Sequence, residues 1–158
     1  IALEHKREIV AAVVYDPAKD EMFVAEKGQG AWMNDQRIRV SGRRVLIECL
    51  FATGIPFGGE RNLPEALQDL ARLMPACAGV RRWGAAALDL AYVASGRFDG
   101  YWERGLHVWD MAAGLLLVRE AGGFAEPIRA DDDILVCGNL IAANSAVFPG
   151  FAKVIRTP

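Results

Sequence analysis

The first quarter of the chain carries short apolar runs separated by turn-forming residues, and this pattern predicts β-strands. Residues 9–15 and 22–25 are rich in Val, Ala and aromatic side chains, and the stretch DPAKD at 16–20 separates them. Because Asp and Pro favour tight turns, we expect an antiparallel hairpin here.

A second hairpin is expected directly afterwards. Residues 31–33 and 37–40 flank Asn34 and Asp35, two residue types that tolerate left-handed backbone geometry. The preceding segment 28–30, with the sequence GQG, is followed by no helical pattern. We therefore interpret it as a bulge or tight turn rather than as a nucleotide-binding loop.

Apolar residues at helical spacing first occur after one more predicted strand. Residues 45–53 form a nearly continuous apolar run with one charge, Glu48, which indicates a buried strand that GIP at 54–56 ends. Leucine and methionine residues then recur at helical spacing over 63–74, and Pro64 suits a first helical turn.

Strands and helices alternate in the rest of the chain. We expect helices over 85–95, 111–121 and 146–155, strands over 98–103, 124–128 and 140–143, and an apolar segment over 134–137. Strands that cluster first and later alternate with helices favour a layered α/β (α+β) fold with a mixed sheet over a doubly wound parallel sheet. Residues 1–158 show no linker and no repeat, so one domain is expected.

Composition narrows the class of protein. At 158 residues and 53% hydrophobic, the chain is long enough to bury a core without disulfides. Eighteen basic and 20 acidic residues give a net charge of −2, so nucleic-acid binding and a broad basic surface are not expected. Cys49, Cys77 and Cys137 form no CxxC pair, which is typical of reduced thiols, and no signal-peptide or membrane-span pattern occurs, so a cytoplasmic location is expected.

Asp110 is the first candidate for chemistry. It stands directly before an apolar run that ends at Gly122 and Gly123, so we expect it at the N-cap of a helix. A helix N-terminus favours anions, and a carboxylate there can bind a hard cation through oxygen. Capping of a buried helix is the alternative role for this side chain.

Several stretches around Asp110 carry a family resemblance. WDMAAGLLLVREAGG at 109–123, preceded by GAAALDLAYVASG at 84–96 and GRFDGYWERGLHV at 96–108, resembles the C-terminal signature of the inositol monophosphatase family. The stretches 13–41 and 43–59 resemble the family's central hairpins and the strand and turn that follow.

The resemblance implies a fold and a missing part. It implies a sugar-phosphatase-type α/β/α/β/α sandwich, of which this chain would form the rear layers. The family's metal-binding glutamate and its Asp-Pro-x-Asp-Gly-Thr motif belong to a front half that these 158 residues do not contain. The 158 residues alone are therefore expected to be inactive.

The resemblance also assigns roles to individual residues. Asp110 matches a Mg2+ ligand, and Glu103 matches a substrate-binding glutamate that accepts hydrogen bonds from polyol hydroxyls. Gly84, Ala85 and Ala86 match a Gly-[Ser/Thr]-Ala stretch that faces the substrate, and Ala85 departs from it because it lacks the hydroxyl.

Each of these residues also has an ordinary structural interpretation. Glu103 could form a surface ion pair with Arg104, and the GAAA stretch at 84–87 could serve close helix packing. His107 has no nucleophile near it in any motif. We interpret Asp89, Asp99 and Glu120 as helix or turn charges, with Asp99 able to order the loop that carries Glu103.

The function that the resemblance implies is Mg2+-dependent hydrolysis of inositol 1-phosphate or a related polyol or sugar phosphate by a metal-activated water, in a homodimeric enzyme. Phosphatases of fructose bisphosphate, NADP, adenosine bisphosphate or histidinol phosphate are variants within that class. A non-catalytic partner of bacterial transcription or ribosomal RNA assembly machinery is the alternative from another class.

Overall fold

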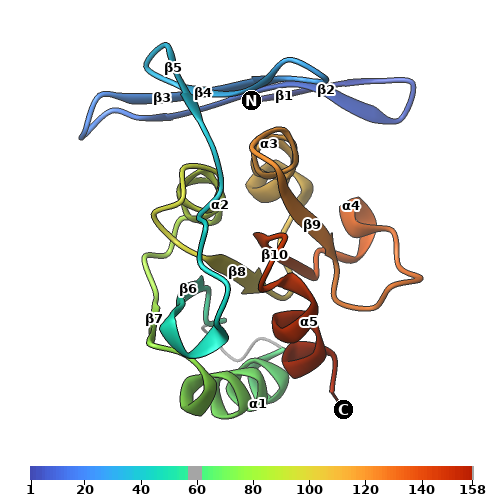
Figure 1. Cartoon of the computed structure of the whole chain (residues 1–158). Helices are drawn as coiled ribbons and strands as arrows, with labels where there is room; N and C mark the ends of the chain where they lie inside the picture. The colour runs from blue at the N-terminus through green and yellow to red at the C-terminus, as the bar shows by residue number, and fades with distance from the viewer. Residues whose placement is uncertain (57–61, 158) are drawn as a thin grey trace.

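Two five-stranded sheets and the helices between and beneath them make up the fold of this protein, in a computed structural model that describes residues 1–56 and 62–157 (Figure 1). The strands are β1 (Ala2–His5), β2 (Glu8–Asp16), β3 (Glu21–Glu26), β4 (Gly30–Met33), β5 (Gln36–Ile38), β6 (Leu50–Thr53), β7 (Gly79–Arg81), β8 (Gly100–Glu103), β9 (Gly123–Pro127) and β10 (Leu140–Asn144). The helices are α1 (Leu63–Leu73), α2 (Ala86–Ala94), α3 (Val108–Glu120), α4 (Ile134–Cys137) and α5 (Phe148–Arg156).

The first sheet is an antiparallel meander in the order β1-β2-β3-β4-β5. Its strands alternate as the sequence pattern predicts: Phe23 and Ala25 are fully buried, whereas Tyr15 and Trp32 are exposed on the opposite face. Both expected hairpins are confirmed.

The turn of the second hairpin has the predicted geometry. Asn34 and Asp35 have φ values of 45° and 63°, which place both in the left-handed region that a two-residue hairpin turn requires. Gly28 and Gly30 also have positive φ, and their backbone N–H groups donate to the Glu120 carboxylate at 2.8 and 2.9 Å. The GQG segment is therefore a turn fastened to α3.

The second sheet is mixed, as predicted, in the order β7-β6-β8-β10-β9. Strand β6 runs parallel to β7 and β8, while β10 runs antiparallel to β8 and β9. Helices α2 and α3 lie between the two sheets, and α1 and α5 cover the other face of the second sheet (Figure 1). This arrangement confirms the layered α/β class.

Helices α2 and α3 pack closely in the middle layer because one contact position has no side chain. A Cβ atom on Gly114 of α3 would lie 2.5 Å from side-chain atoms of Leu90 on α2. Such a distance is below van der Waals contact, so any larger residue at 114 would force the two helices apart.

One predicted strand begins later than expected. The strand expected over 45–53 begins only at Leu50, and Leu46–Glu48 form a 3-10 turn instead. Val45 and Ile47 are more than half exposed, so this apolar run is not buried in the sheet along its whole length. Strand β1 has no counterpart among the strand ranges predicted from the apolar pattern, and all four of its residues are exposed.

Two aromatic residues of the first half of the chain differ in burial: Phe51 is fully buried in the second sheet, and Trp32 in the first sheet is 39% exposed. Phe57 lies outside the described residues.

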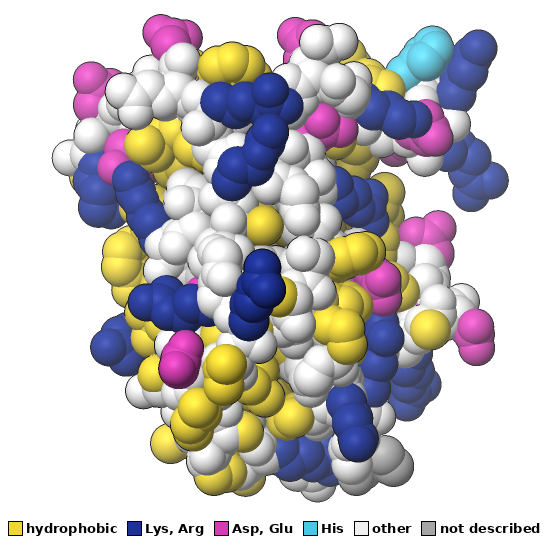
Figure 2. Space-filling model, in the orientation of Figure 1, with side chains coloured by type: hydrophobic (Ala, Val, Ile, Leu, Met, Phe, Trp, Pro, Cys, Tyr) yellow, Lys and Arg dark blue, Asp and Glu magenta, His cyan; other side chains and the backbone are white. Residues whose placement is uncertain are grey.

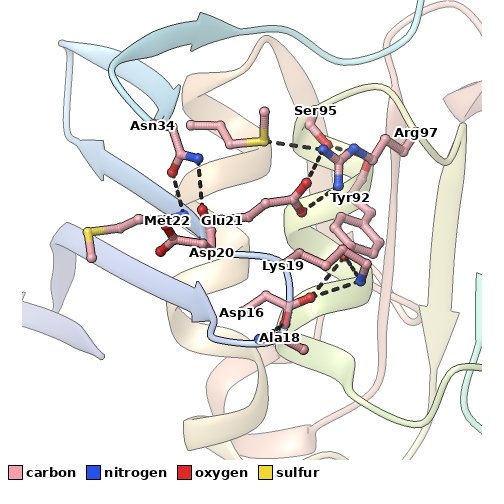
Figure 3. A network of polar contacts seen from close by, with 11 residues as sticks. Asp16, Ala18, Lys19, Asp20, Glu21, Met22, Asn34, Tyr92, Ser95 and Arg97 are labelled. Atoms are coloured by element: carbon pink, nitrogen blue, oxygen red, sulfur yellow. Dashed lines mark hydrogen bonds and ion pairs between the residues drawn. The ribbon is translucent and has the colours of Figure 1, made fainter.

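A polar network fastens the first hairpin to α2 (Figure 3). The Lys19 ammonium donates to the Asp16 carboxylate at 2.9 Å and to the Tyr92 hydroxyl at 2.7 Å. Arg97, just after α2, donates two hydrogen bonds to Glu21, at 2.6 and 2.7 Å. Hydrogen bonds with the Tyr92 hydroxyl and with Asp16 raise the pKa of Lys19 to about 12, so the Lys19 ammonium stays charged at neutral pH.

Three further features are the state of the cysteines, the absence of a membrane-spanning helix among the described residues, and the mixture of charges on the surface. Within residues 1–56 and 62–157 the three cysteines are free thiols, and no described helix has the length and apolar character to cross a membrane. On the face drawn in Figure 2, Lys and Arg side chains are interspersed with acidic and apolar ones.

Candidate active site

The candidate site lies where the topology brings three chain ends together. Helix α2 leads into β8, and β8 leads into α3 after only four residues. Asp89 in the first turn of α2 and Asp110 in the first turn of α3 both act electrostatically on Tyr101 of β8. The N-terminal turns of both helices therefore lie near the carboxyl end of that strand. The positive ends of two helix dipoles at one strand end favour the binding of an anion.

Glu103 occupies the last position of β8 and is half-buried. The fully buried Tyr101 donates its hydroxyl to the Glu103 carboxylate. On another side Glu103 lies against Gly54, where a Cβ atom would come within 1.8 Å of the carboxylate oxygen. Glu103 therefore accepts a hydrogen bond from Tyr101 and occupies the space that a side chain at position 54 would fill.

Glu103 is not held by its sequence neighbour. The Arg104 guanidinium instead donates to the buried Asp69 on α1, at 2.7 and 3.0 Å. The ion pair that the sequence allowed between Glu103 and Arg104 is absent from the salt bridges of residues 1–56 and 62–157. This leaves the polyol-binding interpretation of Glu103 in place.

Asp110 lies in the first turn of α3, but the prediction that it is the N-cap is wrong. The helix begins at Val108 with His107 as its N-cap, and the Asp110 carboxylate accepts the His107 backbone N–H at 3.0 Å. The exposed His107 ring also stacks on Trp109 at 4.5 Å. The helix starts earlier because the Asp110 side chain folds back on the preceding backbone, as in a capping box.

One oxygen of the Asp110 carboxylate, Oδ2, therefore caps the first turn of α3. The other oxygen, Oδ1, takes no part in this hydrogen bond. The side chain is half-buried and lies close enough to Tyr101 to raise the pKa of that phenol. Both roles that the sequence left open for Asp110, capping and cation binding, are compatible with this position.

Gly84, Ala85 and Ala86 form the entry to α2. Gly84 has a φ of 83°, Ala85 is the N-cap and Ala86 is the first helical residue. Ala85 makes no side-chain cap hydrogen bond, as expected of a residue without a hydroxyl. The stretch therefore presents backbone groups at a helix N-terminus, which is the geometry that its proposed role requires.

The sequence interpretation missed Asp89, which it treated as an ordinary helix charge. Asp89 lies in the first turn of α2, is 1% exposed, and its Oδ1 has no hydrogen-bond partner within the described residues. Burial, and then the negative charge of Glu103, raise its pKa to about 7, against the opposing effects of a backbone hydrogen bond from Ala85 and of the Arg82 charge. An acidic residue in an otherwise apolar, small-residue helix is the one signal that could have singled it out.

Asp99 and Glu120 are structural, although Asp99 does not order the loop that carries Glu103. Asp99 is fully buried at the start of β8 and accepts the Leu50 backbone N–H at 2.7 Å. It also accepts the Ser41 hydroxyl and lies 3.3 Å from the Arg43 guanidinium. Asp99 therefore fastens the segment that joins the two sheets.

Two surface hollows lie apart from Glu103 and Asp110. A hollow of about 590 Å³ on the outer face of the first sheet is lined by Tyr15, Met22 and Trp32. A smaller one of about 390 Å³, lined by Thr53, Ile55, Arg82 and neighbours, adjoins the ends of β6 and β7. Neither Glu103 nor Asp110 is among the lining residues of these two hollows, so the candidate site rests on its chemistry and not on a cavity.

The oxygen donors at this site suit a hard cation only in part. Carboxylate oxygens are the ligands that Mg2+ prefers. Yet among residues 1–56 and 62–157 no three potential ligand side chains come together. Asp110 can therefore supply one ligand, and the other ligands would have to come from elsewhere in the protein.

Comparison with known proteins identifies the family to which the chain is similar. The sequence pattern that defines the inositol monophosphatase family matches residues 1–157 of this chain. An inositol-1-monophosphatase of Mesorhizobium japonicum is 48% identical over all 158 residues. A Nus factor SuhB of Pseudomonas aeruginosa is 45% identical over 99% of the chain.

A solved structure has the same fold as this chain. The extragenic suppressor protein suhB from Bartonella henselae superposes with a TM-score of 0.94 at 47% identity, covering 99% of this chain and 60% of that one. The chain spans 59% of the Mesorhizobium relative and 58% of the Pseudomonas relative, so it corresponds to about three fifths of such proteins.

Proposed function

The chain belongs to the inositol monophosphatase family, and on this premise we propose that it is part of a phosphatase that hydrolyses inositol 1-phosphate or a related polyol phosphate with Mg2+. The observation that carries the proposal is the meeting of Glu103 and Asp110 with two helix N-termini at one end of β8. A phosphorylated alcohol needs both features, an anion site and an acceptor for hydroxyls.

Each group of the chain has a distinct task in this reaction. Asp110 would supply one carboxylate oxygen to the metal, which when bound lowers the pKa of a coordinated water and neutralises phosphate charge. The N-termini of α2 and α3 favour the phosphate through their unpaired N–H groups. Glu103, fixed by the Tyr101 hydroxyl, accepts hydrogen bonds from the alcohol and so orients the scissile ester.

The test is phosphate release from inositol 1-phosphate by the intact protein, with and without Mg2+. Asp110→Asn should lower kcat/KM by at least about 100-fold, because one metal ligand loses its charge. Asp131→Asn, the same chemical change at an exposed carboxylate, serves as the control. Activity that survives Asp110→Asn unchanged would remove the metal assignment. Fructose bisphosphate, NADP, adenosine bisphosphate and histidinol phosphate, assayed in parallel, test the substrate variants.

A non-catalytic role is the second candidate, and one observation favours it. The Nus factor SuhB of Pseudomonas is nearly as similar to the chain, at 45% identity, as the inositol-1-monophosphatase of Mesorhizobium at 48%. Under this proposal the intact protein would associate with transcription machinery and release no phosphate. Co-purification with RNA polymerase together with absent phosphatase activity would support it.

The expected homodimer and the cytoplasmic location stay predictions. Light scattering on the intact protein measures the first, and cell fractionation the second.

A further inference from the structure

The smaller of the two hollows is lined by two arginines and has no place in the reaction described so far. Its volume is about 390 Å³, and it opens between the carboxyl ends of β6 and β7 and the C-terminal end of α1. Arg81 and Arg82 both line it, and no acidic side chain occurs among its lining residues within the described part of the chain. This balance of charge favours an anionic ligand.

The remaining lining of the hollow is largely apolar. The larger apolar side chains in it are Ile55, Leu70, Met74 and Val80. Apolar neighbours strengthen the attraction between a guanidinium and an anion, because less water screens the two charges. Both arginines are exposed, so a ligand can reach them from solvent. The planar guanidinium matches the oxygens of a phosphate or a carboxylate better than an ammonium does.

The sheet topology places this hollow beside the candidate site. Strand β6 runs parallel to both of its neighbours, and its residue Ala52 pairs with Arg81 of β7 and with Tyr101 of β8. Arg82 and Glu103 therefore follow at the carboxyl ends of the two strands that flank β6. Neighbouring strands lie about 4.8 Å apart, so β7 and β8 are separated by about 10 Å. A ligand that spans two strand spacings can meet both residues.

The hollow and Glu103 share the residues that end β6. Thr53 and Ile55 line the hollow. Gly54, which lies between them, contacts Glu103 so closely that a Cβ atom at position 54 would lie 1.8 Å from the carboxylate oxygen. The Thr53 hydroxyl donates to the backbone carbonyl of Trp102 at 2.7 Å and so fastens this end of β6 to β8. Glu103 does not line the hollow, but it touches the segment that does.

Arg82 connects the hollow to the entry of α2. Its Nη1 atom would lie 3.2 Å from a Cβ atom on Gly84, the residue that opens the stretch before α2. The Arg82 charge also acts on Asp89 in the first turn of that helix. Arg81, in contrast, donates to the Val80 backbone carbonyl of its own strand at 3.2 Å. Arg82 is therefore the lining arginine that lies next to the candidate site.

We propose that this hollow is a specificity site for the alcohol part of the substrate, in which Arg82 binds a second anionic group. This inference rests on the proposed function and deepens it, because it names the substrate class: polyols or sugars that are phosphorylated at both ends. Glu103 accepts a hydroxyl of such a substrate, and the distal phosphate lies beside Arg82, about two strand spacings away.

The experiment compares two substrates that differ only in the distal phosphate, fructose 1-phosphate and fructose 1,6-bisphosphate, with the intact protein and Mg2+. Hydrolysis of the 1-phosphate consumes one water and releases phosphate together with fructose or fructose 6-phosphate. The wild type should have a KM at least about 10-fold lower for the bisphosphate, because only that substrate can form the charge-assisted hydrogen bond with Arg82.

Three variants test the role of Arg82. Arg82→Gln should raise the KM for the bisphosphate about 10-fold and leave the KM for the monophosphate nearly unchanged. The ratio of the two KM values cancels any effect of the substitution on Asp89 or on folding, since both substrates meet the same protein. Arg82→Lys keeps a positive charge and should retain part of the preference. Arg44→Gln removes an exposed arginine that precedes β6, at the other end of that strand, and should behave as the wild type does.

The outcomes distinguish this inference from the proposed function. Phosphate release from neither fructose phosphate nor inositol 1-phosphate would overturn the proposed function and this inference with it. Phosphate release with equal KM values for the two fructose phosphates would overturn the role of the hollow and leave the phosphatase proposal standing. A preference for the bisphosphate that survives Arg82→Gln would place the distal phosphate elsewhere and would overturn this inference as well.

Discussion

Replacing Asp89 by Asn should make the folded protein more stable at neutral pH. Asp89 is buried without a partner for Oδ1, and its pKa is raised from 3.8 to about 7, first by burial and then by Glu103. The folded state therefore binds a proton that the unfolded state has already released. Asn occupies the same volume and carries no charge at any pH, so the variant escapes this penalty.

The sign and size of the effect follow from the two pKa values. Because the folded-state pKa is the higher one, the penalty is small below pH 4, grows as the pH rises, and levels off above pH 7. At 1.36 kcal/mol per unit, a shift of about 3 units corresponds to about 4 kcal/mol in full. Between pH 5 and pH 8 the wild type should lose about 2–3 kcal/mol of stability relative to Asp89→Asn.

Urea denaturation of the metal-free intact protein, followed by tryptophan fluorescence at pH 5, 6, 7 and 8, measures the difference in unfolding free energy between the two proteins. Carboxylates with lowered pKa values, such as Asp16 and Glu21, are present in both proteins and cancel. Asp131→Asn provides the matched control. A difference between the wild type and Asp89→Asn that stays constant from pH 5 to pH 8 would refute the reasoning.

Three further outcomes are expected. Gly114→Ala should destabilise the protein by about 1–3 kcal/mol, since the added methyl group overlaps Leu90; a thermal melt at unchanged midpoint would contradict the tight helix contact. Arg104→Met should cost about 3–5 kcal/mol, because it leaves Asp69 buried and unpaired; restoration of stability by adding Asp69→Leu checks this cause. Gly54→Ala should raise KM for inositol 1-phosphate with little change in kcat, since a Cβ atom displaces Glu103; a KM equal to that of the wild type would show that Glu103 does not hold the alcohol.

Much of the candidate site could be predicted from the sequence, and the predictions had two different sources. The position of Glu103 at the end of a strand followed from the alternation over 98–103, and its proposed role came from the family resemblance. The position of Asp110 near a helix start followed from the apolar run behind it. Its place within the first turn, rather than at the N-cap, did not, because several residues can open a helix and the backbone contact to His107 decides among them.

Asp89 shows what the sequence left undetermined. In the stretch LDL it has the spacing of any acidic residue in a first helical turn, where exposed Asp is common. Only the packing of α2 against β8 and α3 removes it from water and exposes it to the negative charge of Glu103. The electrostatic cost of a charge depends on the solvent and charges around it, and those neighbours are far away along the chain.

The sequence by itself determined the local elements, namely two hairpins with their left-handed turn residues, an amphipathic α1, and small-residue helices that end at glycines. Hydrophobic period and turn chemistry act over a few residues, so they can be read along the chain. Only the tertiary structure decided that β6 ends against Glu103, that α2 and α3 begin at the same strand end, and that Asp89 is dry. Those facts depend on strand order and burial, which arise from contacts between distant residues.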